Sequence, residues 1–328
     1  MSNSKILLIS ANPEDQVFIT QLAATCGLTF ITVPDVKEGV NHIAHDDICA
    51  SFIDVTEEAS FLEFESEVQN QLGLFSDKVN TNRFHYISSR DLDGVKYLCN
   101  STLFGNFLLR NYTTPLKAKI AAERYAPVVK ASLMDRAFGL KNFFSDKAQI
   151  QNIRVLHSNQ KQKIVEAIRG FLIKARYPTR VATVIANAVD ELVMNGIFAA
   201  PIDEVGHRVY EQTPRDTPIE LVGQAIIDVT LCVDGSRCGI SISDNFGSID
   251  KEKIIRHLST VYTRESYTVK TNVAGAGIGL ATTFRNAGSL IFICEKGSRT
   301  EVAVTYERYE NFKDFKGQFR YIATQFYY

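Results

Sequence analysis

Apolar and polar residues follow two different periods in the first third of the chain. Short apolar runs alternate with longer segments whose apolar residues recur at helical spacing. Strands are expected at 5–10, 28–32, 49–55, 84–88 and 106–110. Helices are expected near 13–26, 35–45, 58–73 and 90–100. The alternation predicts an α/β domain over residues 1–125, with a doubly wound parallel sheet of flavodoxin type.

The pattern becomes largely helical over residues 115–148, with an expected interruption at Pro127. Apolar residues recur there in helical register at Ile120, Tyr125, Val129, Leu133 and Phe138. Such a stripe usually packs on the chain's own domains, and the alternative is the seam of a homodimer. We predict that residues 126–152 form a helical connector.

In the second half of the chain, helices come first and paired strands follow. A helix opened by Ser158 or Asn159 is expected to reach about Lys174, and another follows Pro178. Strands are expected at 153–157, as a pair within 224–245 around an Asp-Gly turn, and as a pair within 289–307. This order predicts a separate α/β sandwich over residues 153–308.

Two polar or aromatic segments lie outside these elements. Residues 201–221 carry three prolines and many charges, and we interpret them as a surface excursion. Residues 309–328 form an extension rich in aromatic side chains. The extension either packs on the second domain or binds elsewhere, and the sequence leaves both open.

Composition narrows the class of protein. The chain has 328 residues, enough for two domains, and 36 Lys and Arg against 37 Asp and Glu give a net charge of -1. Direct binding to nucleic acid is therefore not expected. The six cysteines lack CxxC spacing, which fits a reducing compartment. Neither a secretion signal nor an apolar run of about 18 residues is evident, so we predict a cytoplasmic protein without a membrane partner.

A glutamate and an asparagine interrupt the apolar run DELVMNGIFAA at residues 190–200. Glu191 and Asn195 are four residues apart, so on a helix they project from one face toward the same point. A polar ligand would explain the pair. Alternatively, Glu191 belongs to a solvated stripe and Asn195 lies at a helix end before Gly196. The spacing alone leaves both open.

An aspartate at a strand end is the second polar feature. Asp244 closes ISISDNFG, and Gly247 follows three residues later. A glycine there lets the backbone approach a flat ligand while the carboxylate accepts from an exocyclic amine. A type I turn gives the same pattern.

A third feature is the glycine series in NVAGAGIGLATTF. Gly275, Gly277 and Gly279 precede an apolar helical pattern, where consecutive N–H groups beside a helix N-terminus suit phosphates. A lone GxGxG is a weak signal. It does not directly follow a strand here, and the acidic residue of a dinucleotide fingerprint is missing, which argues against a Rossmann fold.

Taken in order, ExxxN, DxxG, GxGxGL and the GSRT that ends at Thr300 resemble the motifs of the GHKL ATPase superfamily. This is the Bergerat fold of gyrase, histidine kinases and anti-sigma-factor serine kinases, and the resemblance covers about residues 155–307. It implies ATP and Mg²⁺ as ligands. It further implies that Asn195 coordinates Mg²⁺ and that Asp244 accepts a hydrogen bond from the adenine amino group.

The resemblance assigns the remaining boxes as well. Gly247 belongs with Asp244, although the usual DxGxG is reduced to DNFG. The glycine series 275–279 matches the phosphate-binding box. Thr300 matches the threonine that contacts adenine through a bridging water. Residues 248–274 correspond to the ATP lid.

The position of Glu191 separates branches of that superfamily. It matches the general base that gyrase-like and serine-kinase-like members carry, which accepts a proton from water or from a protein hydroxyl. A histidine kinase needs no such base, and its phosphoacceptor would have to be His157, followed here by Ser158 at a strand-to-helix junction. We interpret His157 as a structural or surface histidine. The resemblance is therefore closest to anti-sigma-factor serine kinases.

The first domain resembles a response-regulator receiver over residues 5 to about 125. Asp54, in SFIDV, matches the phosphoacceptor, and Ser88 matches the switch hydroxyl. Ser10 and Ala11 stand where the family has its acidic Mg²⁺-binding pair. Without those carboxylates a hard cation loses most of its oxygen ligands, so we predict a pseudo-receiver.

Two points about this receiver-like site stay open. The usual Lys-Pro after the fifth strand appears as Arg110 and Asn111, and Asp54 could be only a polar strand end. Glu14 and Asp15 are alternative metal ligands.

These features predict a signalling protein that binds Mg-ATP and phosphorylates Ser or Thr of a regulatory partner. That partner would be an anti-sigma-antagonist-like or two-component protein, docked by the pseudo-receiver. One alternative is a non-catalytic, ATP-gated interaction module. Another is an atypical histidine kinase that lacks its own phosphoacceptor domain.

Overall fold

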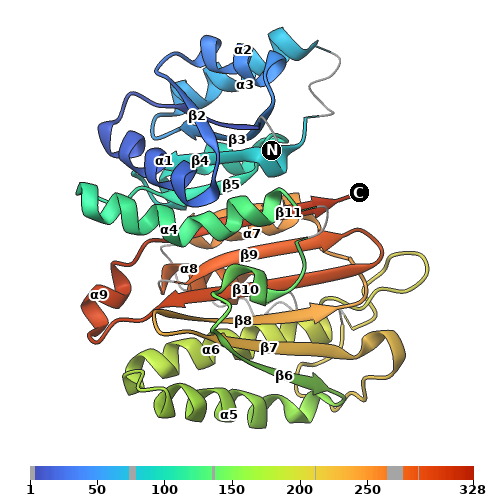
Figure 1. Cartoon of the computed structure of the whole chain (residues 1–328). Coiled ribbons are helices and arrows are strands. Elements are labelled where there is room, and N and C mark those ends of the chain that lie inside the picture. Colours follow the sequence, from blue (N-terminus) through green and yellow to red (C-terminus); the bar gives the residue numbers. More distant parts are fainter. Residues whose placement is uncertain (1–3, 74–78, 135–136, 211, 264–275, 287) are drawn as a thin grey trace. The chain divides into compact units, whose positions relative to one another are not determined.

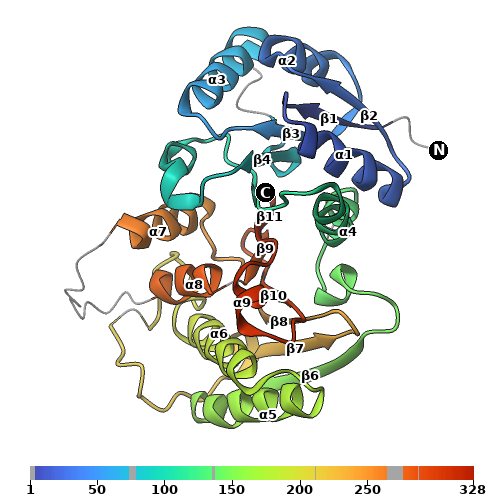
Figure 2. The ribbon, with the colours of Figure 1, turned by 90° about the vertical axis from the view of Figure 1, so that its left-hand side faces the viewer.

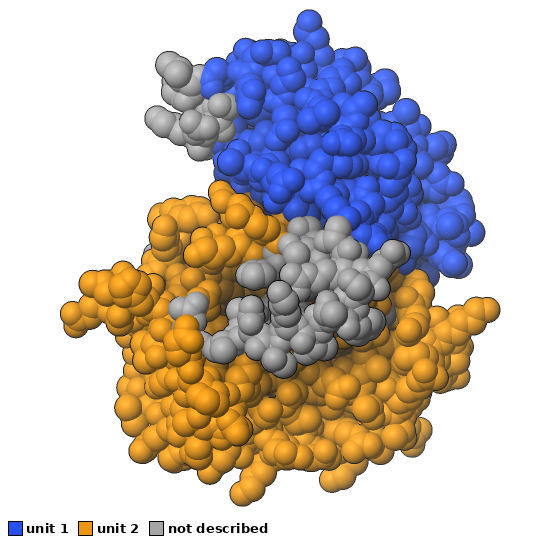
Figure 3. All heavy atoms as spheres, turned by 180° about the vertical axis from the view of Figure 1, so that it is seen from behind, with its two compact units in different colours: residues 1–137, 321–324 blue, residues 138–320, 325–328 orange. Residues whose placement is uncertain are grey.

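The fold is α/β (Figure 1). The structure is a computed structural model and describes residues 4–73, 79–134, 137–210, 212–263, 276–286 and 288–328. Two compact units, coloured separately in Figure 3, divide the chain. Unit 1 contains Met1–Ala137 and Tyr321–Thr324, and unit 2 contains Phe138–Arg320 and Gln325–Tyr328. The residues predicted as a connector are therefore divided between the two units.

Unit 1 alternates strands and helices. Its strands are β1 (Lys5–Ile9), β2 (Thr29–Val33), β3 (Ile48–Asp54), β4 (Phe84–Ser88) and β5 (Asn106–Leu109). Its α-helices are α1 (Pro13–Cys26), α2 (Val36–His45), α3 (Glu58–Leu72) and α4 (Pro115–Ser132). The five strands are parallel in the order β2-β1-β3-β4-β5. Figure 2 shows α1 and α4 on one side of this sheet and α2 and α3 on the other.

Local chemistry sets the ends of α1. The Asn12 side chain accepts a hydrogen bond from the backbone N–H of Glu14, and Pro13 occupies the first helical position. Gly27 ends the helix at φ +70°, a conformation that glycine adopts without strain. These signals explain why the helix has the bounds that the sequence predicts.

Two expectations for unit 1 are wrong. Helix α4 continues through Pro127, where the sequence predicts an interruption. A proline costs one backbone hydrogen bond and some distortion, about 3 kcal/mol. The buried face of α4, which includes Tyr125 and Val129, packs beside α1 and outweighs that cost. The segment expected as a helix at 90–100 is a 3-10 helix, Leu92–Asn100, with non-helical angles at Val95.

Unit 2 has an antiparallel sheet with helices on one face. Its strands are β6 (Gln149–Val155), β7 (Ile227–Val233), β8 (Arg237–Asp244), β9 (Ser289–Glu295) and β10 (Arg299–Glu307). Its α-helices are α5 (Lys161–Lys174), α6 (Thr179–Phe198), α7 (Lys251–Thr263), α8 (Ala276–Arg285) and α9 (Phe312–Lys316). The strand order is β9-β10-β8-β7-β6, and α5, α6 and α8 lie on the same side of it in Figure 2.

Short 3-10 segments complete the described structure: Thr81–Arg83, Leu140–Phe143, Ser158–Gln160 and Gly223–Ala225. The strand predicted at 153–157 begins and ends earlier, as β6. The following helix starts with the turn at Ser158, so the residue that caps it is His157 and neither Ser158 nor Asn159. The Gln160 side chain accepts from the backbone N–H of His157 at 3.0 Å, which stabilises this start.

Helix α6 is the core helix of unit 2. It is the one helix in the described part of the chain that is long and apolar enough to cross a membrane, and most of its residues are buried inside the protein. A Cβ added at Gly196 would lie 2.9 Å from Cγ2 of Ile242 on β8. The missing side chain lets α6 approach the sheet closely, which places Asn195 above β8.

The aromatic segment 309–328 is ordered and packed. It forms α9 and strand β11 (Tyr321–Tyr327). Residues 321 and 322 pair with β5 in antiparallel register, and the Thr324 N–H donates to the Asn106 side chain at 2.8 Å. Farther along, the Tyr327 carbonyl accepts from the Lys296 N–H within unit 2. The extension is thus part of the cores of the two units.

Candidate functional site

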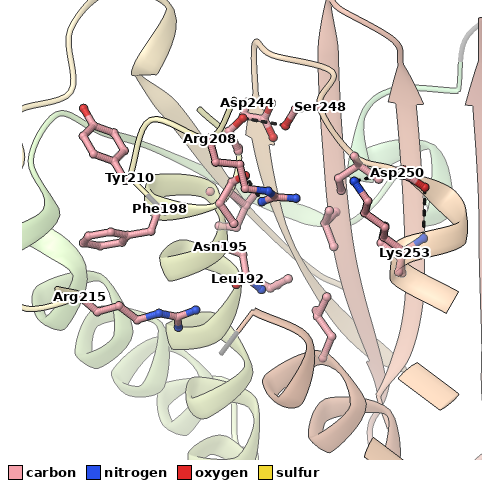
Figure 4. Close-up of a pocket in the computed structure, with 18 of the residues that line it drawn as sticks. Leu192, Asn195, Phe198, Arg208, Tyr210, Arg215, Asp244, Ser248, Asp250 and Lys253 are labelled. Carbon is pink, nitrogen blue, oxygen red and sulfur yellow. Dashed lines mark hydrogen bonds and ion pairs between the residues drawn. The ribbon is translucent and has the colours of Figure 1, made fainter. Parts of the chain in front are cut away.

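A cavity of about 340 Å³ lies in unit 2 over the sheet (Figure 4). Asn195 and Leu192 reach it from α6, Asp244 from the end of β8, and Leu280 from α8. The cavity thus brings together one residue from each of three motifs that are far apart in the sequence. Its wall is apolar around Ile242 and polar at the carboxylate and amide groups.

Asp244 supplies a buried acceptor. The residue is only 5% exposed, and its Oδ1 accepts from the Phe246 N–H at 2.9 Å. Burial raises the pKa of this carboxyl to about 6, although backbone N–H groups of Phe246 and Gly247 lower it. The Asp244 side chain thus closes the bend after β8 by a bond to the backbone, as in an Asx turn, and the type I turn that the sequence offers as an alternative stays a prediction. The same carboxylate also lines the cavity.

Gly247 fits at its position because it has no side chain. Its φ is +58°, and a Cβ there would lie 2.1 Å from the Glu295 carbonyl oxygen. The Gly297 N–H donates to the Gly247 carbonyl at 3.2 Å, joining the loop after β8 to the turn before β10. Thr300, fully buried, is the register partner of Asp244 across β8 and β10. The Asp-Gly and Thr motifs consequently form one corner of the site.

Glu191 and Asn195 share one side of α6 but not one cavity. Glu191 lines a second cavity of about 470 Å³, together with Gly279. A Cβ at Gly279 would lie 2.1 Å from Glu191 Oε2, so the glycine makes room for the carboxylate. Burial raises the pKa of Glu191, while the charge of Arg215 lowers it. The start of α8 therefore borders both cavities, with Gly279 in the second and Leu280 in the first.

Part of the predicted phosphate box and lid cannot be placed. Gly275 and residues 264–274 lie outside the described residues. Gly277 is in the first turn of α8. Residues 248–263 include α7, from which Lys253 and Ile254 line the first cavity.

Sequence reasoning missed the contribution of the polar excursion 201–221. Arg208, Tyr210 and Arg215 line the first cavity, and Figure 4 shows both guanidinium groups pointing into it. Arg208 also donates to the Ala199 carbonyl at the end of α6. The one local signal is chain proximity: the excursion leaves directly from the end of the helix that carries Asn195, which keeps its first residues near that end.

The charges around the first cavity favour an anionic ligand. Its described cations are Arg208, Arg215 and Lys253, and its described anions are Asp244 and Asp250. Lys253 and Asp250 pair at 3.7 Å. The arrangement can hold a molecule with a flat donor group against the buried carboxylate and negative charge near the arginines.

Unit 1 carries a second cluster of predicted site residues. Arg110 Nη2 lies 2.6 Å from Asp54 Oδ2 and 2.5 Å from Asp15 Oδ2, so one guanidinium bridges two carboxylates. Asp15 has no exposed surface, and Ser10 and Tyr112 each donate to it at 2.8 Å. The Asp15 oxygens thus already have protein donors.

Neither alternative metal ligand of unit 1 belongs to a metal-binding cluster. Within the described ranges, no three acidic, His or Cys side chains are grouped to hold a metal ion. His157 is exposed at the junction of β6 and the following helix, as the sequence predicts.

No model of a protein family matches the sequence, and a comparison with curated proteins finds no match. The functional assignment therefore rests on the residues of the two units.

Proposed function

We propose that unit 2 is a GHKL-type ATP-binding domain, and that this protein is a cytoplasmic signalling protein that transfers phosphate from ATP to Ser or Thr of a partner. The observation that carries the proposal is the corner formed by Asp244, Gly247 and Thr300, which lies beside Asn195. These motif residues are far apart in the sequence, and Thr300 lies 105 positions after Asn195.

The cavity offers a partner for each part of the nucleotide. The Asp244 carboxylate accepts from the adenine amine, and apolar residues such as Ile242 and Leu280 cover the ring. Arg208, Arg215 and Lys253 supply positive charge for the phosphates, next to the first turn of α8. The Asn195 amide oxygen is a suitable Mg²⁺ ligand. A bound Mg²⁺ would neutralise phosphate charge.

The structure of unit 1 bears on how the partner would be bound. Its strand order 2-1-3-4-5 is the order of flavodoxin-type doubly wound sheets, to which receivers belong. Arg110 places a fixed positive charge against Asp54, the position of the phosphoacceptor. We propose that unit 1 is a pseudo-receiver that docks the regulatory partner and does not carry phosphate itself.

One observation favours the alternative of an ATP-gated module without catalysis. Glu191, the proposed general base, lines the cavity next to the nucleotide cavity and not the nucleotide cavity itself. If no acceptor enters that second cavity, ATP would only be bound. The other alternative, an atypical histidine kinase, would need a partner to supply the acceptor histidine, because His157 lies at a strand-to-helix junction.

Calorimetric titration of ATP, with and without Mg²⁺, tests the proposal. We expect micromolar binding that requires Mg²⁺ and is lost in Asp244→Asn, because the amide presents a donor where the adenine amine needs an acceptor. Asp146→Asn, an exposed aspartate of the same unit, is the matched control and should bind as the wild type does. Unchanged binding in a folded Asp244→Asn variant would refute the assignment of the adenine site.

A further inference from the structure

The second cavity of unit 2 has a chemistry opposite to that of the first. It is lined by the carboxylates of Asp190 and Glu191 and by neutral polar groups that include Asn187, Thr283 and Asn286. None of its described lining residues is Lys or Arg, whereas the first cavity has three such residues. Lys161, outside the lining, pairs with Asp190 at 2.9 Å, so the negative charge of the cavity is that of Glu191. A phosphate or a nucleotide would meet negative charge here, so the cavity selects a neutral or cationic ligand.

Two polar atoms on its wall lack partners among the described residues. One is Oε2 of Glu191, which is buried as an atom. The other is the hydroxyl of Tyr306, whose side chain is only 1% exposed. Buried polar groups in native proteins are almost always hydrogen-bonded, so a buried carboxylate oxygen and a buried phenol at one cavity indicate a polar ligand.

The second cavity lies next to the proposed nucleotide cavity, as an acceptor site for phosphoryl transfer would. Gly279 borders it, and the next residue of α8, Leu280, borders the proposed nucleotide cavity. The carboxylate of Glu191 fills the space that a Gly279 side chain would occupy. A group in the second cavity would therefore reach the start of α8, where the terminal phosphate is proposed to lie.

We propose that the second cavity holds the acceptor: a peptide segment of the partner with a Ser or Thr hydroxyl beside a basic residue. This inference rests on the proposed function of unit 2. The acceptor oxygen forms a bond to the γ-phosphorus while the bond from that phosphorus to the β,γ-bridging oxygen breaks, which releases ADP. The hydroxyl proton passes to the Glu191 carboxylate. The Glu191 carboxylate attracts the basic residue next to the acceptor, since Asp190 already pairs with Lys161.

Substitution of Asn187 tests the acceptor site, because Asn187 lines the second cavity and not the nucleotide cavity. Asn187 is exposed on α6, one turn before Glu191, so Lys introduced there pairs with that carboxylate at helical spacing. Gln151→Lys, at an exposed position of β6, is the matched control for added charge. Both variants should keep the wild-type affinity for Mg-ATP.

The probe is a positional-scanning library of peptides, each with one Ser or Thr, incubated with full-length protein and radiolabelled ATP. The wild type and Gln151→Lys should label peptides with Lys or Arg beside the acceptor. Asn187→Lys should reduce labelling at least about tenfold, because the general base is engaged, and should lose the basic preference. Labelling of acidic peptides, or equal labelling by Asn187→Lys, would overturn the proposal.

Two further outcomes separate the proposals. If Mg-ATP binds and no peptide is labelled, the acceptor site is refuted while the nucleotide site stands. If Mg-ATP does not bind, the proposed function itself fails, and the acceptor site fails with it.

Discussion

Arg110 bridges two carboxylates of unit 1, and its replacement by methionine is expected to destabilise that unit strongly. Asp15 is fully buried. Its Oδ1 accepts a hydrogen bond from Arg110 Nε at 2.9 Å, and its Oδ2 pairs with Arg110 Nη2 at 2.5 Å. Without the guanidinium, a buried carboxylate is left without its counter-charge, which costs about 3–5 kcal/mol in comparable pairs. Hydrogen bonds from Ser10 and Tyr112 remain. We therefore expect a loss of about 3 kcal/mol in the free energy of unfolding, the lower end of that range.

Two companion variants separate charge from packing. Arg110→Lys keeps the charge but cannot form two parallel hydrogen bonds to Asp15, so we expect an intermediate loss of about 1–2 kcal/mol. Combining Arg110→Met with Asp15→Asn removes both charges. The amide oxygen can accept from one of the two hydroxyls of Ser10 and Tyr112, and the amide N–H can donate to the oxygen of the other. The double variant should therefore be more stable than Arg110→Met alone.

Native-state hydrogen exchange of the full-length protein is the appropriate measurement, because it reports the two units separately. Peptides from β1 and β3 should exchange faster in Arg110→Met, while peptides from β7 and β8 serve as internal controls. The reasoning would be refuted by a loss below about 1 kcal/mol, or by a double variant less stable than Arg110→Met.

The other predictions concern unit 2. With a folded-state pKa of about 6, Asp244 is largely protonated at pH 5, so ATP affinity measured by calorimetry should fall roughly tenfold from pH 7 to pH 5. The same raised pKa means that the stability contribution of Asp244 is full below its ordinary pKa of 3.8 and is lost as the pH rises through 6. Gly247→Ala should destabilise unit 2 in urea unfolding by at least about 2 kcal/mol, because its backbone is left-handed and Cβ meets the Glu295 carbonyl. Arg215→Ala should weaken ATP binding about tenfold and ADP binding less, if its guanidinium faces the terminal phosphate.

Each of these predictions has a contrary outcome. An ATP affinity independent of pH from 5 to 7 would mean that Asp244 does not contact the ligand. Gly297→Ala is the matched control for Gly247→Ala, since its φ is also positive but its Cβ would meet no atom within 4 Å. Equal losses of unfolding free energy in the two variants would show that the left-handed backbone, and not the contact of Cβ with the Glu295 carbonyl, causes the destabilisation. An equal effect of Arg215→Ala on ATP and ADP would place this arginine away from the terminal phosphate.

The regular elements of unit 1 could be predicted closely because their signals are local. Helix α1 has a capping asparagine, Pro13 and a terminal glycine, and the structure has it at the predicted residues. Helix α4 could not be predicted through Pro127, because its continuity depends on packing beside α1. Long-range contacts of this kind leave no mark in a window of neighbouring residues.

The candidate site could be predicted in part for the same physical reason. Asn195 and Asp244 each occur in a short motif, and the two residues line the same cavity of unit 2. Arg208 and Arg215 lie in a segment whose polar composition is typical of solvated loops. Only the path of the chain after α6 turns these side chains toward the cavity. Glu191 and Asn195 line different cavities, which their four-residue spacing does not reveal.

The strand that completes the sheet of unit 1 has a consequence for protein synthesis. Asn106 on β5 receives its hydrogen bond from Thr324, 218 positions later in the chain. During translation, the edge of β5 therefore stays without this neighbour until residues 321–324 have left the ribosome. An open sheet edge is a site of misassociation, so a nascent chain would depend on chaperones or on rapid folding of the intervening unit. Unit 1 expressed as residues 1–137 alone should for this reason be prone to aggregate.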